Sequence, residues 1–132
     1  MRVLLVGMSL LSAVLFSTPA TAQDLQPLME QIGKDFKTSF KAAARGKNSD
    51  ADKAVVARLK DNIIKSRDIL PDGISPDDGE VVARYRGLMS TLLEKTVLLE
   101  DAFGTNPMDR ASAIALLKEM DALRKKGHGI FR

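Results

Sequence analysis

The chain has 132 residues, of which 20 are basic, 17 are acidic and none is cysteine, giving a net charge of +3. Charges of both signs are scattered with no long block of one sign, so no strong field favours nucleic acid or an anionic membrane. The lack of cysteine excludes disulfides, thiolate–metal sites and iron–sulfur clusters.

Residues 1–22 have the three parts of a secretory signal peptide. A basic start precedes an apolar run at residues 3–16, and Ala20-Thr21-Ala22 provides small residues for cleavage. A membrane-spanning helix needs roughly 20 apolar residues, more than this run contains. We therefore expect a secreted chain that is cleaved after Ala22 and does not stay inserted in a membrane. Residues 23–132 then form one domain with a net charge of +2, because one basic residue is lost.

Residues 24–43 are the first predicted helix. Their apolar residues recur every three or four positions, which is the spacing of one face of an α-helix. These positions are Leu25, Met29, Ile32, Phe36, Phe40 and Ala43. Asp24 suits the N-cap, and the turn-forming residues 45–48 predict the end of the helix.

Residues 50–70 repeat the pattern and predict a second helix. The apolar positions are Val55, Val56, Leu59, Ile63 and Leu70. Ser49 or Asp50 can cap its start. The segment Pro71-Asp72-Gly73 is expected to end the helix and turn the chain.

A third helix is predicted to begin at Ser75 and to stop at Gly104. Ser75 is a suitable N-cap and Pro76 fits the first helical position, while the two carboxylates that follow oppose the helix dipole. The apolar positions are Val82, Tyr85, Met89, Leu92, Leu99 and Phe103.

A fourth helix is predicted to open at Asn106-Pro107. Its apolar positions are Ala113, Leu117, Met120 and Leu123. Strand signals are weak throughout, because no alternating run of β-branched residues is bounded by turns. Four helices of about 20 residues with short connections predict an all-α fold, an antiparallel up-down-up-down four-helix bundle.

The sequence contains no enzyme motif. There is no glycine-rich phosphate loop and no His-Glu-x-x-His motif, and one histidine cannot assemble a multi-histidine metal site. The acidic pairs Asp77-Asp78 and Glu100-Asp101 fall at helix ends, where capping and solvation explain them. We therefore expect a protein that is not an enzyme.

Met29 and His128 are the residues whose expected placement suggests chemistry. A lone histidine is commonly a surface residue, and a methionine on an apolar stripe is commonly core. In an antiparallel bundle, however, the start of the first helix and the end of the fourth lie at the same end, so these side chains can face each other. Methionine with histidine is an axial pair for haem iron that suits electron transfer. Arg124, one turn before His128, can bind a propionate carboxylate.

Four patches of the sequence also resemble a known family. Asp24-Leu25-x-x-x-Met29-Glu30 is similar to its mature start, and Arg124-x-x-x-His128-x-x-Phe131-Arg132 is similar to its C-terminus. Residues 58–71 align without a gap with its second helix, and Ser75-Pro76-Asp77 with the start of its third. The chain thus resembles the cytochrome b562 family over nearly all of residues 23–132.

This resemblance implies a periplasmic b-type cytochrome, a monomer that binds one non-covalent haem b and exchanges single electrons with redox partner proteins. Met29 and His128 would be its axial iron ligands. The residues expected to line the haem pocket are Leu25, Leu59, Pro71, Tyr85, Met89 and Arg124. The related cytochrome c′ bundle attaches haem through Cys-x-x-Cys-His, which a chain without cysteine cannot do.

The sequence departs from this family beside His128. Gly127 and Gly129 flank the histidine, and each costs roughly 1 kcal/mol of helix propensity relative to alanine. Gly127 also replaces an aromatic residue of the best-known member, and Leu59 replaces a pocket methionine at similar volume. We therefore expect the last helical turn to fray unless haem orders it. Two other functions stay open, a haem-free periplasmic interaction protein and a haem-based sensor with one easily released ligand.

Overall fold

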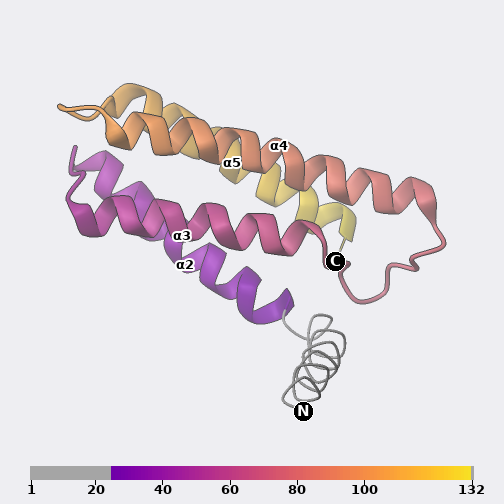
Figure 1. Cartoon of the computed structure of the whole chain (residues 1–132). Coiled ribbons are helices and arrows are strands. Elements are labelled where there is room, and N and C mark those ends of the chain that lie inside the picture. Colours follow the sequence, from indigo (N-terminus) through magenta and orange to yellow (C-terminus); the bar gives the residue numbers. More distant parts are fainter. Residues whose placement is uncertain (1–24, 132) are drawn as a thin grey trace, which may run out of the picture.

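The computed structural model describes residues 25–131, which form four α-helices and no strand. The helices are α2 (Leu25–Ala44), α3 (Asp50–Arg67), α4 (Gly79–Gly104) and α5 (Arg110–Phe131). Each packs against the next in the chain, and α2 also contacts α5 (Figure 1). The predicted all-α, antiparallel four-helix bundle is therefore confirmed. The predicted signal peptide with its cleavage site, the Asp24 cap and Arg132 lie outside the described residues.

The two ends of the bundle differ in what they contain. Figure 1 shows the α2–α3 connection (45–49) and the α4–α5 connection (105–109) at one end, which we call the closed end. The other end, which we call the open end, has the start of α2, the longer α3–α4 connection (68–78) and the end of α5.

The connection from α2 to α3 is built as the sequence predicts. Gly46 has a φ of +66°, and the N–H of Lys47 donates to the carbonyl of Ala42 (2.9 Å), which is a Schellman motif. Ser49 then caps α3, since its side chain accepts a bond from the N–H of Asp52 (3.2 Å). The Asp52 carboxylate accepts one in return from the N–H of Ser49 (3.0 Å), completing a capping box.

α3 ends earlier than predicted. Its last residue is Arg67, and Asp68 is the C-cap, whereas the apolar pattern extends to residue 70. Pro71 disfavours helical backbone at the residue before it, which shortens the helix. Gly73, with a φ of +90°, then turns the chain as expected.

α4 begins three residues later than predicted, with Asp78 as its cap in place of Ser75. The N–H of Asp78 donates to the carbonyl of Ser75 (3.1 Å), so Ser75 and Pro76 belong to a turn. Serine followed by proline is favoured in β-turns as well as at helix starts, and the pattern does not separate the two. The Asp78 carboxylate accepts the capping bond from the N–H of Val81 (3.3 Å).

α5 also begins later than predicted, at Arg110. The Thr105 hydroxyl accepts a bond from the N–H of Asp109 (2.9 Å), which closes a turn around Asn106-Pro107. Asp109 in turn accepts a bond from the N–H of Ser112 (3.2 Å), as an N-cap residue does. The asparagine–proline pair therefore marks the connection and not the helix start.

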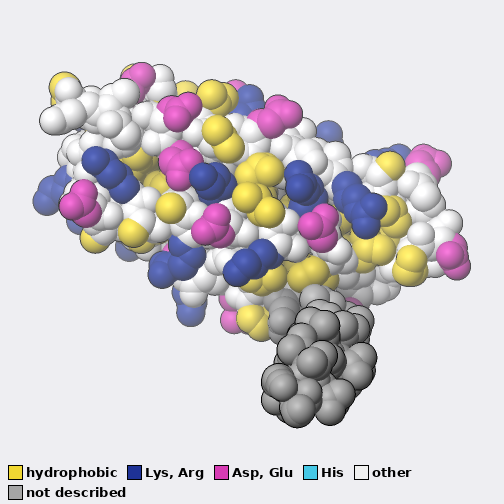
Figure 2. All heavy atoms as spheres, viewed as in Figure 1, with side chains coloured by type: hydrophobic (Ala, Val, Ile, Leu, Met, Phe, Trp, Pro, Cys, Tyr) yellow, Lys and Arg dark blue, Asp and Glu magenta, His cyan; other side chains and the backbone are white. Residues whose placement is uncertain are grey.

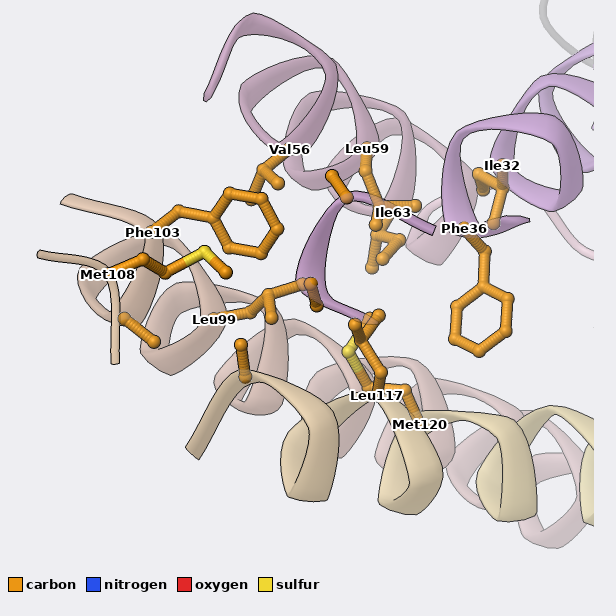
Figure 3. Packing of buried hydrophobic residues seen from close by; sticks show 14 of the residues in the cluster. Ile32, Phe36, Val56, Leu59, Ile63, Leu99, Phe103, Met108, Leu117 and Met120 are labelled. Carbon is orange, nitrogen blue, oxygen red and sulfur yellow. The ribbon is translucent and has the colours of Figure 1, made fainter. Parts of the chain in front are cut away.

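The core takes apolar side chains from all four helices (Figure 3). Most positions of the predicted stripes are buried: Ile32, Phe36, Ala43, Val56, Leu59, Ile63, Tyr85, Met89, Leu99, Phe103, Ala113, Leu117 and Met120. The others are half-buried, and several of these border a cavity near the open end: Leu25, Met29, Leu92 and Leu123.

Polar contacts fasten the helices to one another. Asp35 of α2 is 2% exposed and accepts bonds from Nε (2.8 Å) and Nη2 (2.6 Å) of Arg58 on α3. At the closed end, Asn48 donates to the carbonyls of Phe103 (2.9 Å) and Thr105 (3.0 Å). These bonds satisfy groups that would be costly to bury alone.

No helix in the described range 25–131 is long and apolar enough to cross a membrane. Figure 2 shows basic and acidic side chains intermingled over one face of the molecule. That face therefore has the mixed-sign charge expected from the composition.

Candidate functional site

A cavity of about 250 Å³ lies between the helices in the half of the bundle nearer the open end. Its walls come from all four helices and from the α3–α4 connection. Every residue that the sequence assigns to the site lines it: Leu25, Met29, Leu59, Pro71, Tyr85, Met89, Arg124 and His128. Parts of the chain that are distant in sequence are thus brought together around one apolar space.

Met29 and His128 both line this cavity near the open end. Met29 follows the start of α2, and His128 precedes the end of α5, so each is about 5 Å from the open end along its helix. Met29 is half-buried, whereas His128 is exposed. Met89 and Met120 line the same cavity but are buried. Among the three methionines of the cavity, Met29 is therefore the one that shares with His128 a place within about one turn of a helix end at the open end.

Arg124 lies at the wall between α5 and α2. Its guanidinium carbon is 5.7 Å from the centroid of the Phe36 ring, a cation–π contact across the two helices. Its Nη2 donates to Asp121 (2.8 Å), and this bond lowers the pKa of the Asp121 carboxyl, with Lys125 adding to the effect. Its Nε is buried and has no hydrogen-bond partner in the described part of the chain. The side chain as a whole is 40% exposed, so the accessible part of its guanidinium is suited to an anionic group of a ligand.

Tyr85 forms the wall that faces α3. Its hydroxyl donates to the carbonyl of Ser66 (2.7 Å), and its ring packs edge-on against Phe131 with centroids 5.5 Å apart. Burial raises the pKa of Tyr85 to about 12, and the Asp68 carboxylate adds to the rise. The phenol therefore stays protonated at neutral pH. Its side chain lines the cavity.

Further cavity residues were not assigned to the site from the sequence: Ile32, Gly33, Phe36, Ile63, Leu88, Leu92, Met120, Leu123, Gly127 and Phe131. Most lie on the apolar stripes and were predicted only as core. Leu88 follows Tyr85 by one helical turn, so the same spacing could have identified it. Phe131 lies in the C-terminal patch that carries the family resemblance.

The last turn of α5 is helical through both glycines to Phe131. The fraying expected on helix propensity is therefore not what the structure shows. Gly127 is buried, and the side chain of Leu88 from α4 packs against it. A tertiary contact of this kind can outweigh the unfavourable propensity of glycine.

The donor set restricts which metal could bind. The described residues contain no group of three or more His, Cys, Asp or Glu side chains that could hold a metal ion. Met29 and His128 offer two donors, too few to retain a bare ion. Two donors are the number that iron requires when a macrocycle supplies its other ligands. The residues of the cavity therefore fit an iron porphyrin.

No protein-family model, curated protein or solved structure matches this chain.

Proposed function

We propose that this protein is a periplasmic b-type cytochrome that binds one haem b without a covalent bond and transfers single electrons. One observation carries the proposal. Eight residues chosen from the sequence as haem contacts all line a single cavity, with a thioether and an imidazole each about one turn from the open-end terminus of its own helix. The periplasmic location rests on the predicted signal peptide.

The walls of the cavity suit a flat apolar ring. Leu59, Tyr85 and Met89 are buried on its inner side and offer an apolar floor. Its volume of about 250 Å³ is below the roughly 300–1,000 Å³ of common ligand pockets, so a macrocycle bound there would not be fully enclosed. His128 is exposed, which leaves its side of the site accessible to other proteins.

Arg124 supports the same ligand. A porphyrin carries carboxylates on an apolar body, and the partly exposed guanidinium of Arg124 is a charged donor group on an apolar wall. The contact with Phe36 and the bond to Asp121 fix the guanidinium on the α2 side of the cavity. Arg124 is therefore assigned to bind and orient a propionate.

Bound haem supplies a one-electron iron couple, and the residues of the chain tune it. The Met29 thioether and the surrounding apolar side chains favour the reduced, less charged state and so raise the potential. Met29 and His128 would hold the iron, and with both donors bound the group would supply electron transfer and no substrate binding. Redox partner proteins would make transient contact at the mouth, where His128 is exposed.

Haem titration of the purified protein tests this proposal. We expect one haem per chain and a low-spin, six-coordinate visible spectrum. Met29→Leu and His128→Ala should each abolish the six-coordinate spectrum, because each removes one donor. Met89→Leu and Met120→Leu are matched controls, since both residues line the cavity but are buried, and both variants should keep the spectrum.

The opposite result supports a different function. No haem uptake by the wild-type protein would contradict the proposal and favour the haem-free interaction protein. The exposed apolar residues Val97 (41%) and Leu98 (50%) on α4 offer that protein a contact surface. Equal loss of the spectrum in the buried methionine variants would contradict the assignment of Met29.

A further inference from the structure

Position 127 of α5, directly before His128, is obstructed by a side chain from α4. Gly127 is buried and lines the cavity. A Cβ atom added there would lie 2.7 Å from Cδ2 of Leu88 on α4, a separation that real Cβ atoms essentially never show. The Leu88 side chain therefore occupies the space beside the helix backbone that a residue at 127 would otherwise fill.

The restriction is confined to this wall of the cavity. Gly33 lines the same cavity from α2, and a Cβ added there would have no heavy atom within 4 Å. Gly129, one residue after the histidine, is equally unobstructed. A side chain at 127 would thus have to displace the tip of Leu88, while the helix itself continues through Gly129 to Phe131.

Leu88 is able to move within that space. It is half-buried, and the atom nearest to Gly127 is the far end of a flexible side chain. Packed onto the Gly127 backbone, its methyl groups lie back against α5. A methyl group at 127 would push them away from α5, and the free space on that side is the cavity that both residues line.

We propose that Leu88, packed against Gly127, determines the specificity of the cavity by setting the thickness of ring that can enter beside His128. This inference deepens the proposed function and rests on it for the identity of the natural ligand. The ligand class that it concerns is a flat aromatic ring system with an anionic group, which the apolar walls and Arg124 would bind together.

Thermal unfolding of the protein without added ligand tests the contact itself. Gly129→Ala should raise the unfolding midpoint by about 2–4 °C, because alanine favours the helix and nothing obstructs it. Gly127→Ala should lower the midpoint, since the same gain is outweighed by displacement of Leu88. In a Leu88→Ala background, Gly127→Ala should instead raise it. A rise with Gly127→Ala in the wild-type background, equal to that of Gly129→Ala, would overturn the proposal.

Ligand binding tests the role in specificity. We expect Gly127→Ala to weaken binding of anilinonaphthalene sulfonate, a ring system with an anionic group, by about tenfold. Leu88→Ala with Gly127→Ala should restore it, and Gly129→Ala should leave it unchanged. Unaltered binding by Gly127→Ala would refute the role of Leu88.

Haem titration of the same four proteins separates this inference from the proposed function. A tenfold loss of haem affinity in Gly127→Ala, with recovery in Leu88→Ala with Gly127→Ala, supports both the inference about Leu88 and the proposed function. Failure of every protein to bind haem, with the sulfonate series as expected, would contradict the cytochrome and leave Leu88 as the determinant for another ring ligand.

Discussion

The closed and open ends of the bundle differ in how completely their side chains are packed. At the closed end, the side-chain amide of Asn48 donates two hydrogen bonds to backbone carbonyls at the end of α4, and Phe103 is 1% exposed. At the open end, Arg124 has a buried nitrogen without a partner among the described residues, and a cavity takes the place of packed side chains. The open end thus keeps a cavity, while the closed end is fastened by these contacts.

This difference indicates where the stability of the fold comes from. Leu99 and Phe103, in the last turns of α4, are almost fully buried. The open end gives up some packing, and the ion pair of buried Asp35 with exposed Arg58 and the bond from Tyr85 to Ser66 link its helices. Stability and ligand binding are therefore separable by mutation.

The largest expected contrast is between two leucines on the same face of α4. Leu99 is fully buried in the core, and Leu92 is half-buried at the cavity wall. Leu99→Ala should lower the unfolding free energy by about 2–5 kcal/mol, and Leu92→Ala by only about 1 kcal/mol, because the first opens a new void and the second enlarges an existing one. Urea denaturation measures both. Equal losses would remove the distinction between the two ends.

The next effect concerns pH and Tyr85, the only tyrosine of the chain. Its pKa is about 12 in the folded protein, compared with about 10 when unfolded. The folded state therefore binds the phenol proton more tightly. Its stabilisation is complete below about pH 10 and is lost as the pH rises toward 12, by up to about 2–3 kcal/mol.

An ultraviolet titration of the phenol in folded and unfolded protein checks this shift. Ionisation of the phenol and deprotonation of lysines both lower the stability at alkaline pH. Tyr85→Phe should remove the contribution of the phenol and leave that of the lysines. A folded midpoint near 10 would show that water reaches the hydroxyl and that this wall is open.

The smallest contrast compares one polar residue from each end. Asn48→Ala should cost about 1–2 kcal/mol of unfolding free energy, because it leaves two carbonyls at the closed end without their donor. Arg124→Met should cost less than about 1 kcal/mol without ligand, since it removes an unpaired buried donor and a partly exposed ion pair. Chemical denaturation in the absence of haem compares them. A larger loss for Arg124→Met would make that residue structural.

Much of the fold follows from the sequence, because apolar spacing and caps are local signals. Gly46 and Ser49 illustrate this, since each residue fulfils the role that its neighbours predict. The starts of α4 and α5 were placed too early because Ser75-Pro76 and Asn106-Pro107 fit turns as well as helix starts. Only the capping hydrogen bonds that Asp78 and Asp109 accept decide between these two possibilities.

The cavity itself was only partly predictable. Bundle topology was enough to bring Met29 and His128 to one end, and the structure places both at the cavity. The packing of Leu88 on Gly127 depends on how two helices approach each other, which periodicity does not encode. The same holds for the unpaired Nε of Arg124, which is visible only once Phe36 and Asp121 are in place.

Hydrogen exchange with and without haem tests the central claim most directly, because it reports both ends of the bundle at once. Haem should slow amide exchange in residues 25–36 and 120–131, around the cavity, by at least about tenfold. Residues 102–113 at the closed end should change little by comparison. No change on adding haem, or equal slowing at both ends, would contradict the assignment of the open end as a haem site.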